Sequence, residues 1–116
     1  MLTEKDYCDY KTSCTLYELG FTLDMTEKVY ERNLMTNRYE TIPKPLLYEA
    51  QKWLREEKFL LIVVDRLLHG EYVFSIVDIL NYSEEKNGTA NSYEDALSEG
   101  IKEAVKILKD YETIHE

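Results

Sequence analysis

The residues suited to nucleophilic catalysis are two cysteines, Cys8 and Cys14, and two histidines, His69 and His115. A cysteine nucleophile needs a neighbouring base to take up its proton, and histidine is the usual one. His115 lies one residue from the end of the sequence, which leaves Cys14 with His69 as the pair that could act together. The cysteine spacing matches neither a C-x-x-C redox motif nor half of a zinc site. The sequence therefore favours two reduced thiols that pack as small apolar groups.

Two carboxylates, Asp65 and Asp78, lie within apolar segments and are the candidates for acid–base chemistry. Pairing of these segments through a two-residue turn puts Asp65 opposite Phe74 and Asp78 opposite Leu61, so the two aspartates are not cross-strand partners. Each is expected to face solvent or to pair with an arginine.

Metal and cofactor motifs are not evident in the sequence. The chain has 23 acidic residues, so close carboxylate pairs arise by chance and carry little information about metal binding. The four glycines are scattered singly and form no phosphate-binding loop. We therefore predict no catalytic, metal or cofactor-binding residues and no cofactor.

Length and composition fit one globular domain over residues 1–116, with 44% apolar and 32% charged residues. The longest apolar run, residues 59–64, is too short to cross a bilayer. The first residues do not resemble a secretory signal, so we expect a cytoplasmic protein that does not enter membranes.

The formal charge of −9 opposes binding to a phosphate backbone unless the basic residues cluster, and in the sequence they do not. Folding could still gather Lys28, Arg32, Arg38 and Lys44. The ten tyrosines favour an interface, because tyrosine offers apolar area with one polar tip. The expected partner is another protein and not a nucleic acid.

The first half of the chain predicts a helix, an irregular hairpin and a second helix. Asp9 caps the first helix, whose apolar stripe is Tyr10, Ser13, Cys14 and Tyr17, and Gly20 ends it. Strand-like residues at 29–30 and 39–42 flank turn-forming asparagines in the poorly defined segment 22–42. Pro45 starts a helix to about residue 58, with Trp53 buried between this helix and the sheet.

The second half predicts two strands, 59–68 and 71–80, joined at His69-Gly70, so that Val63 pairs with Ile76. Residues 81–91 are expected to form a polar loop. Ser92 caps the last helix, whose Gly100 indicates close packing and whose end frays from about residue 110. The fold class is therefore α+β: an antiparallel sheet of three to four strands, with three helices mainly on one face, in the order α-β-β-α-β-β-α.

The segment from Ile42 to Glu56, with the Gly20-Phe21 helix end and the closing helix from Ser92, resembles small uncharacterised proteins of gut bacteria and their phages or mobile elements. The shared motifs are a proline-started helix, a core tryptophan and a capping box. The resemblance implies the fold and no activity.

We therefore predict a noncatalytic protein-binding or regulatory module, with phage or mobile-element origin and a host protein as its target. One specific form is an acidic decoy that occupies a nucleic-acid-binding surface. The alternative is a small enzyme with a site built from Cys14, His69 or Asp65 and Asp78.

Overall fold

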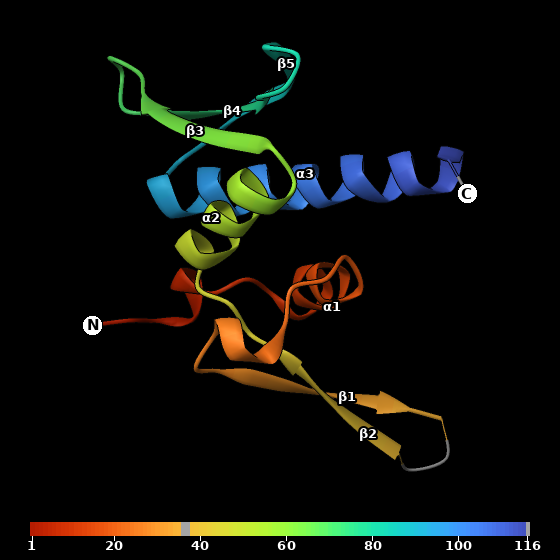
Figure 1. Cartoon of the computed structure of the whole chain (residues 1–116). Helices are drawn as coiled ribbons and strands as arrows, with labels where there is room; N and C mark the ends of the chain where they lie inside the picture. Colours follow the sequence, from red (N-terminus) through yellow and green to blue (C-terminus); the bar gives the residue numbers. More distant parts are fainter. Residues whose placement is uncertain (36–37, 116) are drawn as a thin grey trace.

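The computed structural model describes residues 1–35 and 38–115, with side chains up to residue 112. In this part of the chain, three α-helices and two antiparallel sheets form the predicted α+β fold (Figure 1). The strands belong to two separate sheets, one of two strands and one of three. The elements are η1 (Glu4–Asp6), α1 (Tyr10–Glu18), η2 (Leu23–Met25), β1 (Val29–Leu34), β2 (Arg38–Pro43), α2 (Leu47–Glu57), β3 (Leu60–Arg66), β4 (Tyr72–Asp78), β5 (Ser83–Ala90) and α3 (Tyr93–His115).

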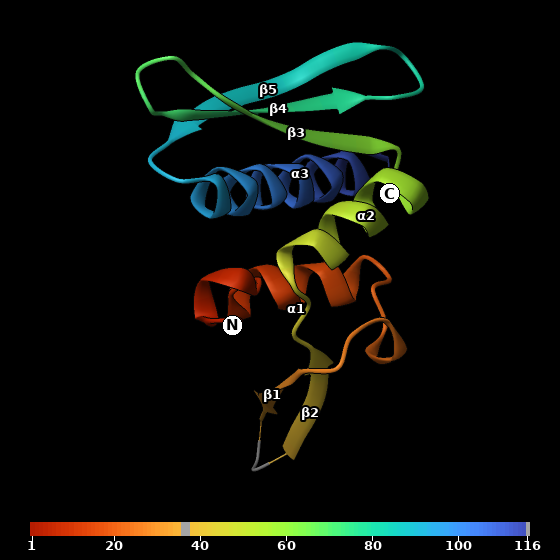
Figure 2. The ribbon, with the colours of Figure 1, turned by 90° about the vertical axis from the view of Figure 1, so that its left-hand side faces the viewer.

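The helices and the two sheets are arranged in successive layers from one end of the molecule to the other. The three-stranded sheet lies at one end, α3 covers one of its faces, and α2 joins this half to α1 and the β1–β2 hairpin (Figure 2). The hairpin extends away from the remaining elements, and the radius of gyration is 14.8 Å. A compact domain of this length has a radius of gyration of about 13 Å, so the hairpin lengthens the molecule.

The turn between β3 and β4 is longer than the predicted two-residue turn. The Leu67 N–H donates to the Glu71 carbonyl at 2.7 Å, and the Gly70 N–H donates to the Leu67 carbonyl at 3.0 Å. Residues 68–70 therefore form a three-residue loop. Such a loop ends with a residue in the left-handed region, and Gly70 has a φ of +98°.

This extra residue shifts the register of β3 against β4 by one position. Ile62 lies opposite Ile76 and Asp65 lies opposite Val73 in the antiparallel ladder. A shift of one residue exchanges the faces of a strand, so Ile62 and Ile76 both point into the core beneath α3. The predicted pairs Val63 with Ile76, Asp65 with Phe74 and Leu61 with Asp78 are wrong.

Residues 81–91 contain the strand β5, which corrects the prediction of a polar loop. β5 pairs with β4 in an antiparallel ladder that holds one bulge beside Ile76 and Val77. Gly88 lies opposite Phe74, and a Cβ on Gly88 would lie 2.7 Å from Cε1 of that ring. The glycine therefore makes room for an aromatic core residue, while backbone bonds hold the polar strand in place.

The helix α1 begins and ends where the sequence predicts. The Asp9 carboxylate accepts a hydrogen bond from the Thr12 N–H at 2.8 Å, and Gly20 follows the helix with a φ of +117°. Its buried face differs from the predicted stripe and consists of Thr12, Ser13 and Leu16. Tyr10 and Tyr17 face the hairpin instead, where they contact Tyr30 and Arg32.

Trp53 of α2 is buried, with 8% of its surface exposed, but it does not lie between its helix and the sheet. Its ring meets Phe21 edge to face at 5.6 Å between centroids. The helix α3 extends to His115, through the segment from residue 110 that was expected to fray. No helix in the described part of the chain is both long enough and apolar enough to span a bilayer.

Candidate binding site

The structure does not bring Cys14 and His69 together. Cys14 lies half-buried on α1, whereas His69 is exposed in the β3–β4 turn, with Nε2 3.5 Å from the Glu71 carboxylate. Figures 1 and 2 both show α1 and this turn on opposite sides of α3. The His115 side chain lies outside the described residues.

Cys8 and Cys14 are both free thiols, and Cys8 has only 2% of its surface exposed. Burial raises the pKa of the Cys8 thiol, and the nearby Asp9 and Glu49 carboxylates raise it further. A thiol in this environment stays protonated at neutral pH and is a poor nucleophile.

Asp65 and Asp78, the candidates for acid–base chemistry, have different surroundings. Asp65 is exposed on β3. Asp78 organises the corner after β4, because its carboxylate accepts from the Leu80 N–H at 3.0 Å and from the Asn81 N–H at 3.3 Å. Among the described residues, no group of three acidic, histidine or cysteine side chains converges as metal ligands would.

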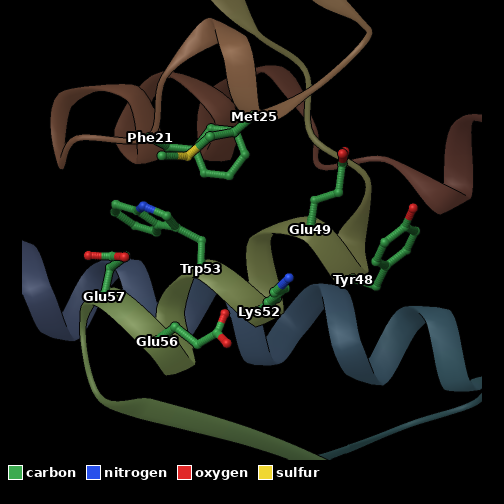
Figure 3. Close-up of a pocket in the computed structure, with 8 residues that line it drawn as sticks. All are labelled: Phe21, Met25, Tyr48, Glu49, Lys52, Trp53, Glu56 and Glu57. Atoms are coloured by element: carbon green, nitrogen blue, oxygen red, sulfur yellow. The ribbon is translucent and has the colours of Figure 1, made fainter.

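A cavity of about 350 Å³ lies between α2 and the segment that follows α1. Gly20 ends α1 and turns the chain so that Phe21 and Met25 lie over Trp53, as Figure 3 shows. The opposite wall is a helix face, because residues 48, 49, 52, 53, 56 and 57 recur at the three- and four-residue spacing of an α-helix. Its lining residues are Phe21, Met25, Tyr48, Glu49, Lys52, Trp53, Glu56 and Glu57.

Two smaller cavities adjoin this one at Tyr48, whose side chain is 62% exposed. One, of about 160 Å³, is lined by Leu2, Asp6, Leu46, Leu47, Tyr48, Tyr93, Glu94 and Leu97. The other, of about 250 Å³, is lined by Leu2, Tyr7, Thr26, Glu27, Lys28, Leu46, Tyr48 and Glu49. We call the residues that line these three cavities the Tyr48 surface.

The Tyr48 surface carries negative charge without compensating ion pairs. Six acidic and two basic side chains line it, namely Asp6, Glu27, Glu49, Glu56, Glu57, Glu94, Lys28 and Lys52. Within the described part of the chain, none of these eight forms an ion pair. The Glu49 carboxylate accepts a hydrogen bond from the Leu46 N–H at 2.7 Å and thereby caps the start of α2.

Several acidic residues elsewhere on the chain form ion pairs with basic residues. Arg32 Nη2 lies 2.6 Å from Glu40 and its Nη1 lies 3.3 Å from Glu18. Lys44 pairs with Glu4 at 2.7 Å. Two members of the expected basic group, Arg32 and Lys44, are therefore neutralised.

The basic residues gather at another place, in a groove of about 530 Å³ between α1 and α3. Four lysines and three acidic residues line this lysine groove, namely Lys11, Lys102, Lys106, Lys109, Asp9, Glu99 and Glu103. Lys102 lies 3.4 Å from Asp9, and Lys109 lies 3.1 Å from Glu18. The groove is therefore partly neutralised.

The sequence reasoning did not single out the Tyr48 surface. The available signal was the spacing of Tyr48, Lys52 and Glu56, which share one side of α2 at intervals of four residues. That spacing is typical of any solvent-facing helix side. The cavity exists only because Gly20 returns the chain over this side, which periodicity does not report.

Comparisons of the chain with models of protein families, with curated proteins and with solved structures give no match. The chemistry of the site itself therefore carries the functional conclusion.

Proposed function

We propose that this chain is a noncatalytic binding module that engages a basic protein through the Tyr48 surface. The observation that carries the proposal is that apolar cavities and carboxylates without an ion pair among the described residues lie on one surface. Protein interfaces combine these two features, with a desolvated apolar centre and a charged rim.

The apolar part of the surface is accessible to a partner. The exposed fractions are 62% for Tyr48, 57% for Leu2, 44% for Tyr93 and 41% for Met25. Tyrosine and methionine are enriched at interfaces, because one is a rigid amphipathic side chain and the other adapts its shape. These side chains supply contact area, and the cavities between them supply sockets for partner side chains.

The charge selects the class of partner. An acidic surface attracts basic surfaces, speeds their association and disfavours acidic ones. Because these carboxylates form no ion pair within the described part of the chain, binding a basic protein does not require such a pair to be broken.

The resemblance to small proteins of gut bacteria and their phages supports a narrower form of the proposal. In this form the partner is a host protein, and the acidic module covers a basic surface that otherwise contacts nucleic acid. Both the general proposal and this narrower form require a partner with a basic surface.

The test is affinity capture from a lysate of the cell in which the protein occurs, comparing two charge variants. Glu56→Lys with Glu57→Lys reverses charge on the Tyr48 surface. Glu84→Lys with Glu85→Lys makes the same change of net charge on exposed residues of β5. A partner that is lost with the first variant and retained with the second, and that elutes at raised salt, supports the proposal. Equal capture by both variants contradicts it.

A further inference from the structure

We infer that the cavity beside Trp53 receives a single basic side chain of the partner, with arginine preferred over lysine. This inference rests on the proposed function and names the group that the partner inserts. The cavity is the largest of the three on the Tyr48 surface, at about 350 Å³.

The walls of the cavity suit the stem of a long side chain. Phe21, Met25 and Trp53 provide apolar and aromatic surface around it (Figure 3). Arginine and lysine bury their aliphatic stems on such surfaces while the charged head remains near solvent. Aromatic rings also attract a cation placed over their faces, tryptophan most strongly.

One cation of the chain already lies beside the indole of Trp53. The Lys58 ammonium lies 5.4 Å from the centre of the Trp53 ring. Lys58 does not line the cavity, so it leaves the cavity open to a second positive group.

The rim of the cavity suits the charged head. Glu56 and Glu57 form no ion pair among the described residues, and Figure 3 shows the Glu57 carboxylate beside the indole. Lys52 is the one base among the lining residues. An anion would face an excess of carboxylates, whereas a cation gains from them. Guanidinium is favoured over ammonium, because it stacks on aromatic faces and bonds a carboxylate through two parallel N–H groups.

The test uses the only tryptophan of the chain as a reporter. The indole N–H of Trp53 gives one NMR resonance, which is followed during titration with Nα-acetyl-arginine methylamide. The matched probe is Nα-acetyl-citrulline methylamide, which has nearly the same shape and no charge. We expect the arginine probe to shift the indole resonance saturably, with an affinity about three to ten times that of the citrulline probe.

Three variants test whether negative charge at the rim of the cavity strengthens binding of the arginine probe and whether positive charge weakens it. Glu56→Gln with Glu57→Gln should weaken binding of the arginine probe by about threefold, as expected for exposed ion pairs. Lys52→Gln should strengthen it by a similar factor. The control, Glu84→Gln with Glu85→Gln, should leave it unchanged. Amide spectra that otherwise overlay with the wild type show that each variant is folded.

Equal binding of the two probes, or an indole resonance that does not move, overturns the inference. The proposed function fails separately, because it is judged by the captured protein. A partner lost with Glu56→Lys and Glu57→Lys, together with an indole that ignores arginine, leaves the module in place and removes the arginine socket. If the indole responds to arginine but no captured partner depends on the charge of the Tyr48 surface, the arginine socket stands and the proposed function fails.

Discussion

A Cβ placed on Gly100 of α3 would lie 2.7 Å from Cγ2 of Ile62 in β3, which is closer than two such atoms can approach. The glycine therefore sets how near the helix lies to the sheet. Alanine in place of glycine within a helix ordinarily stabilises it by about 1 kcal/mol. Here the clash reverses the sign, because both Gly100 and Ile62 are buried.

We predict that Gly100→Ala lowers the free energy of unfolding by about 1–3 kcal/mol, the usual cost of overfilling a packed core. Chemical denaturation measures the change. In an Ile62→Ala background, where Cγ2 is absent, the same substitution should be neutral or stabilising. If Gly100→Ala instead raises the free energy of unfolding in the wild-type background, α3 and the sheet can move apart at little cost, which contradicts the prediction.

Trp53→Ala should destabilise the protein by about 3–5 kcal/mol, which is a large part of the stability of a small domain. The reason is the loss of a ring that is 8% exposed and packs against Phe21. Tyr39→Ala, which removes an aromatic side chain that is 64% exposed, is the matched control and should change stability far less. Wild-type melting of the Trp53 variant, or fluorescence typical of a fully exposed indole, would contradict the observed packing.

The Cys8→Ala, Cys14→Ala double variant should fold, since both thiols are free. The stripe predicted for the first helix included Cys14, which would have given this cysteine the larger share of the stability loss. The structure assigns it to Cys8, which is 2% exposed, whereas Cys14 is half-buried. In the native wild type, a thiol reagent should modify Cys14 much faster than Cys8, whose raised pKa and burial both protect it. A disulfide, or faster modification of Cys8, would contradict this order.

Acid should weaken the pairing of β1 with β2 at Arg32 and Glu40, and with it the contact of the hairpin with Tyr17 of α1. The Arg32 guanidinium and then the Tyr17 hydroxyl donate to Glu40 and hold the pKa of its carboxyl below the ordinary value. A lowered pKa in the folded state gives stability that is present above the unfolded pKa of about 4.3 and is lost as the pH falls through the folded pKa. The Glu40→Gln variant has no carboxyl group at this position, so it lacks this pH-dependent contribution to stability.

The difference in Tm between wild type and Glu40→Gln should therefore be largest near neutral pH and should shrink as the pH falls below about 4. Thermal melts across this range measure it. Glu31→Gln, which alters another hairpin glutamate outside the observed ion pairs, is the control. A difference that does not depend on pH would mean that Glu40 acts by packing alone.

The sequence predicted those elements whose signals are local. The Asp9 and Ser92 caps and the Gly20 helix end are decided by one or two turns of chain, and each is present in the structure. The strand β5 has no such signal, because its residues Ser83–Ala90 are polar and its pairing depends on backbone bonds to β4.

The register and the Tyr48 surface needed information that lies outside single segments. One additional loop residue beside Gly70 moved every cross-strand pair of β3 and β4. Likewise, Met25 and Trp53 are far apart in the sequence and meet only when the chain after α1 folds back over α2. Polar side chains on α2 therefore gave no sign of a cavity.

Nucleic acid should not bind this protein appreciably, although its lysines are less evenly spread than the sequence suggested. With a net charge of −9, approach to a phosphate backbone is repulsive at long range, and salt screens this repulsion beyond about 8 Å. Among the described residues, four lysines lie together in the lysine groove, so local attraction could compete there. Lys102 and Lys109 there are already held by Asp9 and Glu18.

We expect no micromolar binding of labelled duplex or single-stranded oligonucleotides, even at low salt, where electrostatic attraction is strongest. The decisive comparison is Lys11→Glu with Lys106→Glu in the lysine groove against Lys28→Glu with Lys52→Glu on the Tyr48 surface, since both pairs change the net charge equally. Binding by the wild type that falls steeply with salt and disappears only with the first pair would show that the groove receives phosphate. That result would contradict the prediction, because four lysines would then outweigh both the neighbouring carboxylates and the charge of the whole chain.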